Sequence, residues 1–159
     1  SVFSMLAMLL ERAGTGATGS VTGIYTVLVD GDDHNEPIAD AARSILDGHV
    51  VLDRKLAVQG HYPSVDAVAS ISRVASRVTN PEQKKLAQTL RAAMAAQRQA
   101  QDLIDVGAYV PGSNPMVDAA VTNTDAINDF LRQRMDDVTP AAEAWQRLDN
   151  LVAAMGLKA

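Results

Sequence analysis

Hydrophobic and polar positions divide the chain into a front part of short segments and a back part of long amphipathic stretches. Residues 20–30 form a nearly continuous apolar run rich in β-branched side chains, which predicts a strand buried on both faces of a parallel sheet. Apolar residues recur at helical spacing over 38–45, and a short second strand is predicted over 49–52. Asp53 then begins a helix that runs to Gln59. This alternation of strand and helix favours an α/β fold with a parallel sheet.

The first ten residues are apolar and predict a helix that ends at Gly14. They lack the basic stretch of a secretory signal peptide, and Glu11-Arg12 follows where a cleavage site would need small residues. This helix has almost no room for an N-terminal cap, and only about two strands follow it where a sheet usually holds about five. We therefore expect the chain to begin inside a larger protein, with further strands of the sheet before Ser1.

The back half is predicted to be helical. Asn80 at the cap, Pro81 at the first helical position and Gln83 three residues after the cap are typical of a helix start. We place the domain boundary at 78–80, so that 1–79 form the α/β part and 80–159 a helical domain. Later helices are predicted to begin at Asn114-Pro115 and Thr139-Pro140, and helices are predicted to end near Gly107 and at Gly156.

Each predicted helix has one apolar face that is expected to pack in the core of the helical domain. These faces comprise Leu86, Leu90, Ala93, Met94, Gln97, Ala100 and Ile104, then Met116, Val117 and Ala120, then Ile127, Phe130, Leu131 and Met135, and last Trp145, Leu148, Val152 and Met155.

Composition narrows the class of protein. The 159 residues are 47% hydrophobic and 21% charged, which excludes disorder and a collagen-like repeat. No apolar run approaches the roughly 18 residues that a membrane-spanning helix needs. The net charge of −5 disfavours nucleic acid and an anionic membrane surface as general partners. Without cysteine the chain forms no disulfide and no thiolate metal site, which fits a reducing cytoplasm.

The residues show no complete catalytic apparatus. Three histidines lack the spacing of metal ligands on one helix face, so no metal site is predicted. Asp32-Asp33 could hold Mg²⁺, and a solvated turn is the simpler alternative. The phosphate-binding motif G-x-x-x-x-G-K-[ST] and the nucleophile motif G-x-S-x-G are both missing.

Two short stretches carry the candidate chemistry. Tyr62 stands immediately before Pro63, where a helix has just ended. Arg73 lies in an otherwise apolar neighbourhood, and its forked donors suit either a carboxylate or a phosphate. From the pattern alone, a structural ion pair remains an alternative for Arg73, and burial in a core remains one for Tyr62.

The run from Gly19 to Val74 closely resembles the trailing part of the nucleotide-binding domain of type III export ATPases. These are the flagellum-specific ATPase and its virulence-secretion relatives, which are related to the β subunit of rotary ATP synthase. The stretch DLIDVGAYVPGSNPMVD at 102–118 resembles the beginning of the C-terminal helical domain of the export ATPases specifically. The resemblance covers almost the whole chain. It implies the trailing fragment of a RecA-like P-loop ATPase core followed by a C-terminal helical bundle, with the phosphate-binding loop and the residues that orient Mg²⁺ upstream of Ser1.

The resemblance also implies roles for single residues. Arg73, in the context S-R-V, matches the arginine finger that reaches the γ-phosphate of ATP in the neighbouring subunit. Tyr62 matches the aromatic residue that stacks on adenine, and Tyr109 is a second adenine contact for which packing at a helix end is an alternative. The acidic loop facing the central channel, where a coiled-coil stalk protein binds, corresponds to Asp32, Asp33 and Glu36; a solvated loop is the alternative there.

These roles imply a homo-hexameric ATPase, dependent on ATP and Mg²⁺, that energises flagellar or type III protein export. Its expected place is the cytoplasm, peripheral to the membrane export gate, with a central stalk, export chaperones and substrates as partners and without nucleic acid. The amphipathic stripes are assigned to core packing, with chaperone docking as an alternative for them. Two other functions stay open, namely a non-catalytic helical interaction module and a rotary ATP synthase or vacuolar-type subunit. The isolated chain is expected to be inactive, because it lacks the phosphate-binding loop.

Overall fold

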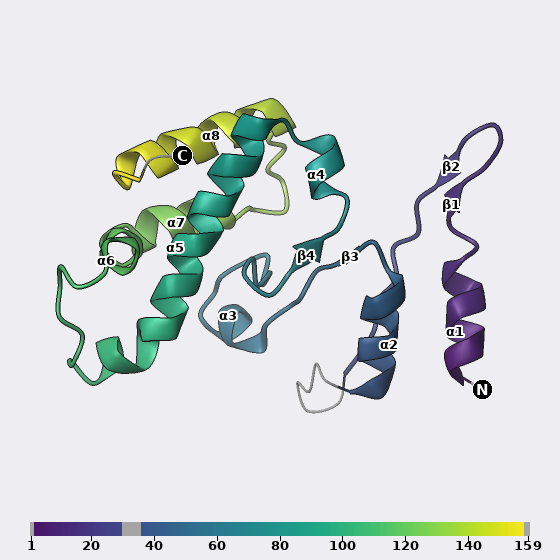
Figure 1. The fold of residues 1–159 in the computed structure, drawn as a ribbon, viewed down its shortest axis with the longest axis horizontal. Helices are drawn as coiled ribbons and strands as arrows, with labels where there is room; N and C mark the ends of the chain where they lie inside the picture. Colours follow the sequence, from purple (N-terminus) through teal and green to yellow (C-terminus); the bar gives the residue numbers. More distant parts are fainter. Residues whose placement is uncertain (1, 30–35, 158–159) are drawn as a thin grey trace. The chain divides into compact units, whose positions relative to one another are not determined.

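The computed structural model of the chain describes residues 2–29 and 36–157, which form two compact units, Ser1–His49 and Val50–Ala159 (Figure 1). Each unit has its own helices and short strands. The first unit contains α1 (Val2–Leu10), β1 (Gly14–Thr15), β2 (Ser20–Val21), α2 (Pro37–Ile45) and β3 (Gly48–His49). The second contains α3 (Arg54–Val58), β4 (Ile71–Ser72), α4 (Ala75–Val78), α5 (Pro81–Asp105), α6 (Pro115–Thr122), α7 (Thr124–Leu131) and α8 (Ala141–Ala154).

In the first unit, α1 packs against α2, and a small hairpin follows α1. The hairpin pairs β1 with β2 in antiparallel register, with Gly14 opposite Val21. Helix α2 begins with Pro37 at its first position and buries Ala39 and Ala42. The helix predicted over 38–45 is therefore confirmed.

The strand predicted over 20–30 is wrong for this structure. Among the described residues of this segment, only Ser20–Val21 forms a strand, and several apolar residues after it are solvent-exposed, with Ile24 at 93% and Leu28 at 89%. A strand is stabilised on both faces only when neighbouring strands supply hydrogen bonds and helices cover the faces. Within the described part of the first unit, β1 alone pairs with this segment, over two residues. The apolar run is present, but the pairing that would bury it is not.

The second unit begins with a loop region that holds the candidate residues. Asp53 caps α3 by accepting a hydrogen bond from the Lys55 N–H at 2.7 Å, as predicted. Gly60 ends the helical segment with a φ of +71°, a conformation that favours glycine. Of the strand predicted over 49–52, His49 lies in β3, and Leu52 forms an isolated antiparallel bridge with Val65. Val50 and Leu52 are solvent-exposed.

The helices α5, α6, α7 and α8 form a bundle in which α5 packs against α6 and α8 (Figure 1). The capping box predicted for α5 is confirmed, because Asn80 accepts from the Gln83 N–H at 2.8 Å and Gln83 Oε1 accepts from the Asn80 N–H at 3.0 Å. Gly107 and Gly156 follow α5 and α8 with positive φ, as expected of helix stops. The buried core comprises Leu86, Leu90, Ala93, Ala120, Ile127, Leu148, Leu151, Val152 and Met155.

One predicted core residue of the bundle is wrong. Met135 is solvent-exposed in the loop after α7, which ends at Leu131 with Arg132 in an extended conformation. The loop is held by polar contacts instead, since the Arg134 N–H donates to Asp137 Oδ2 at 3.0 Å and Arg134 Nε to Asp136 Oδ1 at 3.0 Å. Local side-chain acceptors here compete with continuation of the helix. Among the described residues, the helices are all too short or too polar to cross a membrane.

Candidate functional site

Tyr62 lies in the loop after α3, in the second unit, with 58% of its surface exposed. It precedes Pro63 through a cis peptide bond. The Tyr62 carbonyl accepts a hydrogen bond from the Gln133 N–H at 3.0 Å, which ties this loop to the residues that follow α7. An exposed aromatic ring on a loop held in this way offers a flat apolar face for stacking on a planar ligand.

His61, directly before Tyr62, is buried and only 3% exposed. Its backbone N–H donates to the Leu56 carbonyl at 2.9 Å, and Nε2 has no hydrogen-bond partner among the described residues. Burial, followed by the positive charge of Arg132, lowers the pKa of His61. The neutral imidazole therefore serves as an apolar anchor under the Tyr62 loop, a role that the sequence analysis did not assign to it.

A turn over 66–70 precedes Arg73, and Asp66 organises its first half. The Asp66 side chain is nearly buried, and Oδ1 accepts from the Val68 N–H at 3.0 Å, from the Ala69 N–H at 2.9 Å and from Arg98 Nη2 at 2.8 Å. Burial alone would raise the pKa of Asp66, but the hydrogen bond from Arg98, with those from Ala69 and Val68, holds it below its usual range.

A second arginine of α5 binds the other half of this turn. Arg91 Nη1 donates to the Ala67 carbonyl at 2.6 Å and to the Ser70 carbonyl at 3.0 Å, and Nη2 donates to the Val68 carbonyl at 3.1 Å. One planar guanidinium thus satisfies three backbone acceptors, which the fixed fork of arginine allows and a lysine ammonium would do less well.

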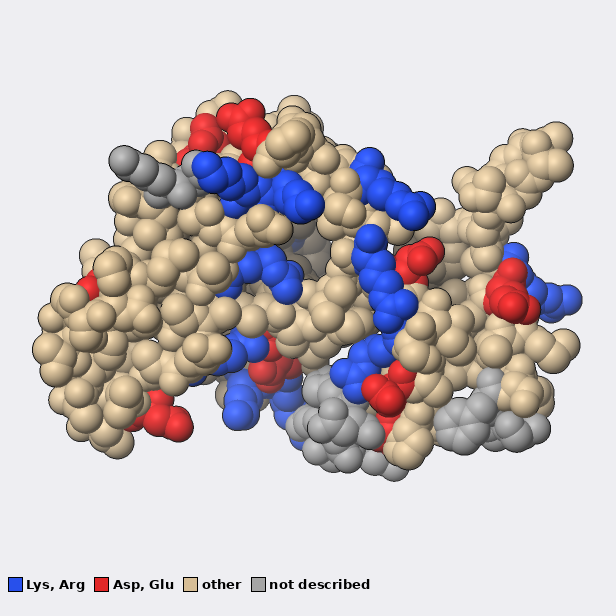
Figure 2. All heavy atoms as spheres, viewed as in Figure 1, with Lys and Arg blue, Asp and Glu red and all other residues tan. Residues whose placement is uncertain are grey.

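Arg73 follows β4 directly and is exposed. It belongs to a basic stretch, because residues 54–98 contain eight Lys and Arg residues against two acidic ones in a chain of net charge −5. Figure 2 shows Lys and Arg side chains gathered beside α4 and over the first turns of α5. An exposed arginine in such a basic stretch is suited to an anionic group such as a phosphate.

Tyr109 lies at a different place in the second unit, after the end of α5. Its hydroxyl is 2.9 Å from Asp118 Oδ1 and 3.2 Å from the Asn114 carbonyl, so it helps to close the loop into α6. The ring lines a shallow hollow with residues of α5 and α6, and Tyr62 does not line that hollow. These contacts are those of a structural tyrosine at a helix end.

The predicted acidic loop is only partly visible. Asp32 and Asp33 lie outside the described residues. Glu36 is half-buried at the start of α2, where its carbonyl accepts from the Asp40 N–H at 3.0 Å and its side chain makes no capping hydrogen bond. Among the described residues, no group of three His, Asp or Glu side chains could hold a metal ion.

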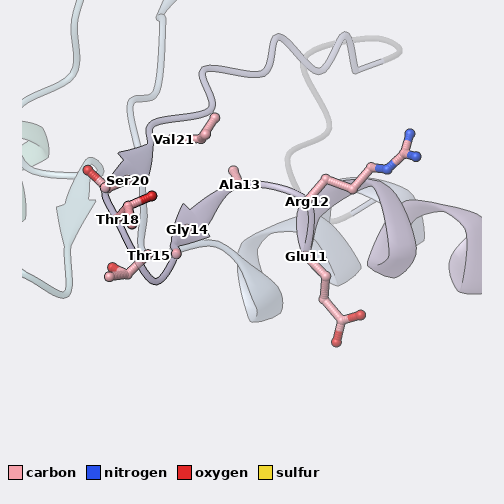
Figure 3. A pocket seen from close by; sticks show the side chains of 10 residues that line it. Glu11, Arg12, Ala13, Gly14, Thr15, Thr18, Ser20 and Val21 are labelled. Carbon is pink, nitrogen blue, oxygen red and sulfur yellow. The ribbon is translucent and has the colours of Figure 1, made fainter.

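A second hollow, in the first unit, lies beside the β1–β2 hairpin and is lined by residues between Glu11 and Val21 (Figure 3). Glu11 and Arg12 point away from the hairpin and from each other, and small side chains such as Thr15, Thr18 and Ser20 make up the rest. This hollow brings together no set of groups that could perform a reaction.

Tyr62 and Arg73 stand out in the sequence, whereas the residues that hold their loops do not. Asp66 and Arg98 stand 32 positions apart, and Arg91 stands 21 to 24 positions from the carbonyls it binds. The only local signal is the spacing of Arg91 and Arg98, two helical turns apart on one side of a predicted helix. That spacing alone gives no indication of which loop the two arginines bind.

Two family models match the chain. Residues 1–72 match the ATP synthase alpha/beta family, nucleotide-binding domain, and residues 79–150 match the T3SS EscN ATPase C-terminal domain. The chain is 45% identical to the type 3 secretion system ATPase of Pseudomonas syringae pv. syringae, over 98% of this chain and 34% of the relative. It is 48% identical to the flagellum-specific ATP synthase of Pseudomonas aeruginosa, over 96% of this chain and 34% of the relative. The chain thus spans about a third of the length of the curated relatives it matches.

Solved structures give the same result for the fold. The assembled ATPase EscN from the type III secretion system of enteropathogenic E. coli superposes with a TM-score of 0.87 at 40% identity, over 95% of this chain and 37% of EscN. EscN in complex with its central stalk EscO superposes with a TM-score of 0.83 at 39% identity, over 95% of this chain and 36% of that one. The fold of this chain is therefore shared with a part of a much longer chain.

Proposed function

The chain belongs to the family of type III secretion and flagellar export ATPases, and on this premise we propose that it is the finger-bearing part of an ATP-hydrolysing protein. Its fold is the trailing part of a RecA-like P-loop ATPase core followed by a helical bundle. We assign 1–79 to the nucleotide-binding domain and 80–159 to the C-terminal helical domain. The match of 79–150 to the export-ATPase domain favours this family over a rotary ATP synthase.

The observation that carries the proposal is the exposed position of Arg73 in a stretch rich in Lys and Arg, three residues after a turn that α5 holds in place. In the proposed hexamer, Arg73 contacts the γ-phosphate of ATP bound by the neighbouring subunit. Its fixed positive charge neutralises the charge that builds up on the phosphoryl oxygens in the transition state, an effect worth about 10³–10⁵ in rate in related chemistry.

Tyr62 is the second assignment in this proposal. Its exposed ring stacks on the adenine, and the loop is kept in place by the Gln133 hydrogen bond and by buried His61. Tyr109 is assigned as a second adenine contact through its ring, since its hydroxyl donates a hydrogen bond to Asp118. Mg²⁺ and the triphosphate are held mainly by residues that this chain does not contain, and the described residues offer no cluster of metal ligands.

The partners follow from the same proposal. The acidic residues Asp32, Asp33 and Glu36 are assigned to binding of a central coiled-coil stalk, and EscN has been solved in complex with its central stalk EscO. Export chaperones and substrates dock on the helical domain. The hexamer acts in the cytoplasm at the base of the export gate and does not bind nucleic acid.

The test is Arg73→Ala in the full-length protein, with Arg77→Ala as the matched control, since Arg77 is an exposed arginine four residues further on. We expect Arg73→Ala to lower ATP turnover about 10³-fold or more while ATP affinity stays within a fewfold of the wild type. Arg77→Ala should keep most of its turnover. Near-normal turnover in Arg73→Ala would show that Arg73 is not the finger. A non-catalytic interaction module would show no ATP turnover in any of the three proteins.

A further inference from the structure

We propose that α5 positions the finger, with Arg91 and the Arg98–Asp66 pair as positioning residues for Arg73; this inference rests on the proposed function. These residues do not contact the nucleotide in this proposal. They hold the turn over 66–70, and through that turn they set where β4 and the Arg73 guanidinium lie.

The turn is bound to α5 at two points. The Arg91 guanidinium donates hydrogen bonds to the carbonyls of Ala67, Val68 and Ser70, so these three carbonyls must point toward one group. Arg98 forms an ion pair with the carboxylate of Asp66 at the start of the same turn. Arg91 and Arg98 are seven residues apart, about 10 Å along the helix axis, so the two points fix both the position and the direction of the turn.

Ser70 passes this constraint on toward Arg73. Its Oγ donates to the Asp66 carbonyl at 2.6 Å and accepts from the Val51 N–H at 2.9 Å, and its own carbonyl is one of the three that Arg91 binds. Only Ile71 and Ser72 separate Ser70 from Arg73. A span of three residues is at most about 10 Å long, so a shift of Ser70 moves the start of the finger with it.

The binding partner of the turn is also the longest helix of the bundle. Leu86, Leu90 and Ala93 of α5 are part of the bundle core, on the same helix that carries Arg91 and Arg98. A movement of the bundle's first helix is therefore transmitted to Arg73 through hydrogen bonds and an ion pair. Positioning errors of about 1 Å are enough to cost on the order of 10²-fold in rate, so this hold is functionally significant.

The experiment is a double-mutant cycle in the full-length protein with Arg91→Ala, Arg73→Ala and the double variant. Lys85→Ala serves as the matched control, because it removes an exposed cation earlier on the same helix. We expect Arg91→Ala to lower kcat about tenfold to a hundredfold with KM for ATP within twofold, and Arg91→Lys to recover part of the loss. In the Arg73→Ala background, where turnover is measured with excess enzyme, Arg91→Ala should lower kcat no further.

Hydrogen exchange on the same full-length variants provides the structural readout. Arg91→Ala should speed exchange of the Val68 and Ala69 amides and leave the α5 and α8 core amides unchanged, whereas Lys85→Ala should change neither. The proposal is overturned if Arg91→Ala keeps wild-type kcat, or lowers kcat equally in the Arg73→Ala background. It is also overturned if the turn's exchange is unaltered. The Arg73→Ala arm alone reports on the proposed function, so the two failures are told apart.

Discussion

Nη2 of Arg98 lies 2.8 Å from Oδ1 of Asp66, across 32 positions of sequence. The carboxylate is nearly buried at 7% exposure, while about half of the arginine side chain reaches solvent. The same oxygen also accepts two backbone N–H groups of the turn that leads to Arg73. This ion pair therefore joins the bundle to the candidate finger loop and satisfies a buried charge at the same time.

The Asp66 contacts predict a loss of stability in acid. Because the pKa of Asp66 is lower in the folded chain than in the unfolded chain, its contribution is complete above the unfolded pKa of about 3.9 and is lost as the pH falls through the folded value. Asp66→Asn should lower the free energy of unfolding by about 1–2 kcal/mol at pH 7, since Arg98 is half exposed, and by less at pH 3 than at pH 7. Urea unfolding at the two pH values measures this difference.

The matched control for Asp66 is Asp136→Asn. Asp136 also pairs with an arginine, Arg134 at 3.0 Å, but both side chains are exposed to water. We expect no measurable change in unfolding for this variant at either pH. Equal destabilisation by the two substitutions would show that burial does not distinguish the two ion pairs.

His61 predicts a second, milder dependence on pH. Its pKa is lowered in the folded chain, so unfolding takes up a proton, and stability falls as the pH drops from about 6.5 toward the folded pKa. His61→Phe and His61→Gln cannot be protonated, and both should show a smaller loss of stability than the wild type between pH 7 and pH 5. Guanidinium unfolding between pH 7 and pH 5 measures this loss. If the unfolding free energy of both variants depends on pH as strongly as that of the wild type, His61 is not the group responsible.

The capping box of α5 predicts a measurable cost for its removal. Asn80→Ala deletes the side-chain acceptor of the Gln83 N–H and should lower the free energy of unfolding by about 1 kcal/mol. Asn150→Ala, on the exposed surface of α8, is the control and should stay within about 0.5 kcal/mol of the wild type. Thermal and urea unfolding followed by circular dichroism measure both.

The exposed apolar segment after β2 predicts self-association of the 159-residue chain. Ile24 and Leu28 present apolar side chains beside backbone that lacks strand partners in the described structure. Ile24→Lys with Leu28→Lys should raise the monomer fraction in light scattering at high concentration, whereas Met135→Lys, an exposed apolar position in the second unit, should not. A wild-type chain that stays monomeric at high concentration would contradict this prediction.

The isolated chain should not hydrolyse ATP. It offers Arg73 and Tyr62 but neither a phosphate-binding loop motif nor a cluster of metal ligands among its described residues, and positioning of the triphosphate accounts for most of this catalysis. Calorimetry should detect no micromolar binding of MgATP. Binding of that strength would show that these residues form a nucleotide site without help from another segment.

Sequence reasoning succeeded where the signal is local. The starts at Asn80 and Asn114 and the stop at Gly107 depend on the chemistry of three or four consecutive residues, and all three lie where they were predicted. The strand over 20–30 failed because a strand is stabilised by partners elsewhere in the structure, which an apolar run does not specify.

In the candidate site, too, the residues in local motifs are predictable and the long-range contacts are not. A single residue in a recognisable context, such as Arg73 or Tyr62, can be named from a motif. The Arg91 contacts to three carbonyls cannot be, because backbone acceptors have no sequence signature and lie more than 20 positions away. Their role became evident only from the distances between atoms.

The hydrogen bond between the Gln133 N–H and the Tyr62 carbonyl joins main chain to main chain. Nineteen of the twenty amino acids carry that N–H, so this bond by itself places no demand on the side chain at position 133, and proline alone would sever the link. A search for invariant residues would pass over this position, although the aromatic ring's placement depends on it. Substitution of loop residues by proline, in place of alanine, reveals backbone hydrogen bonds of this kind.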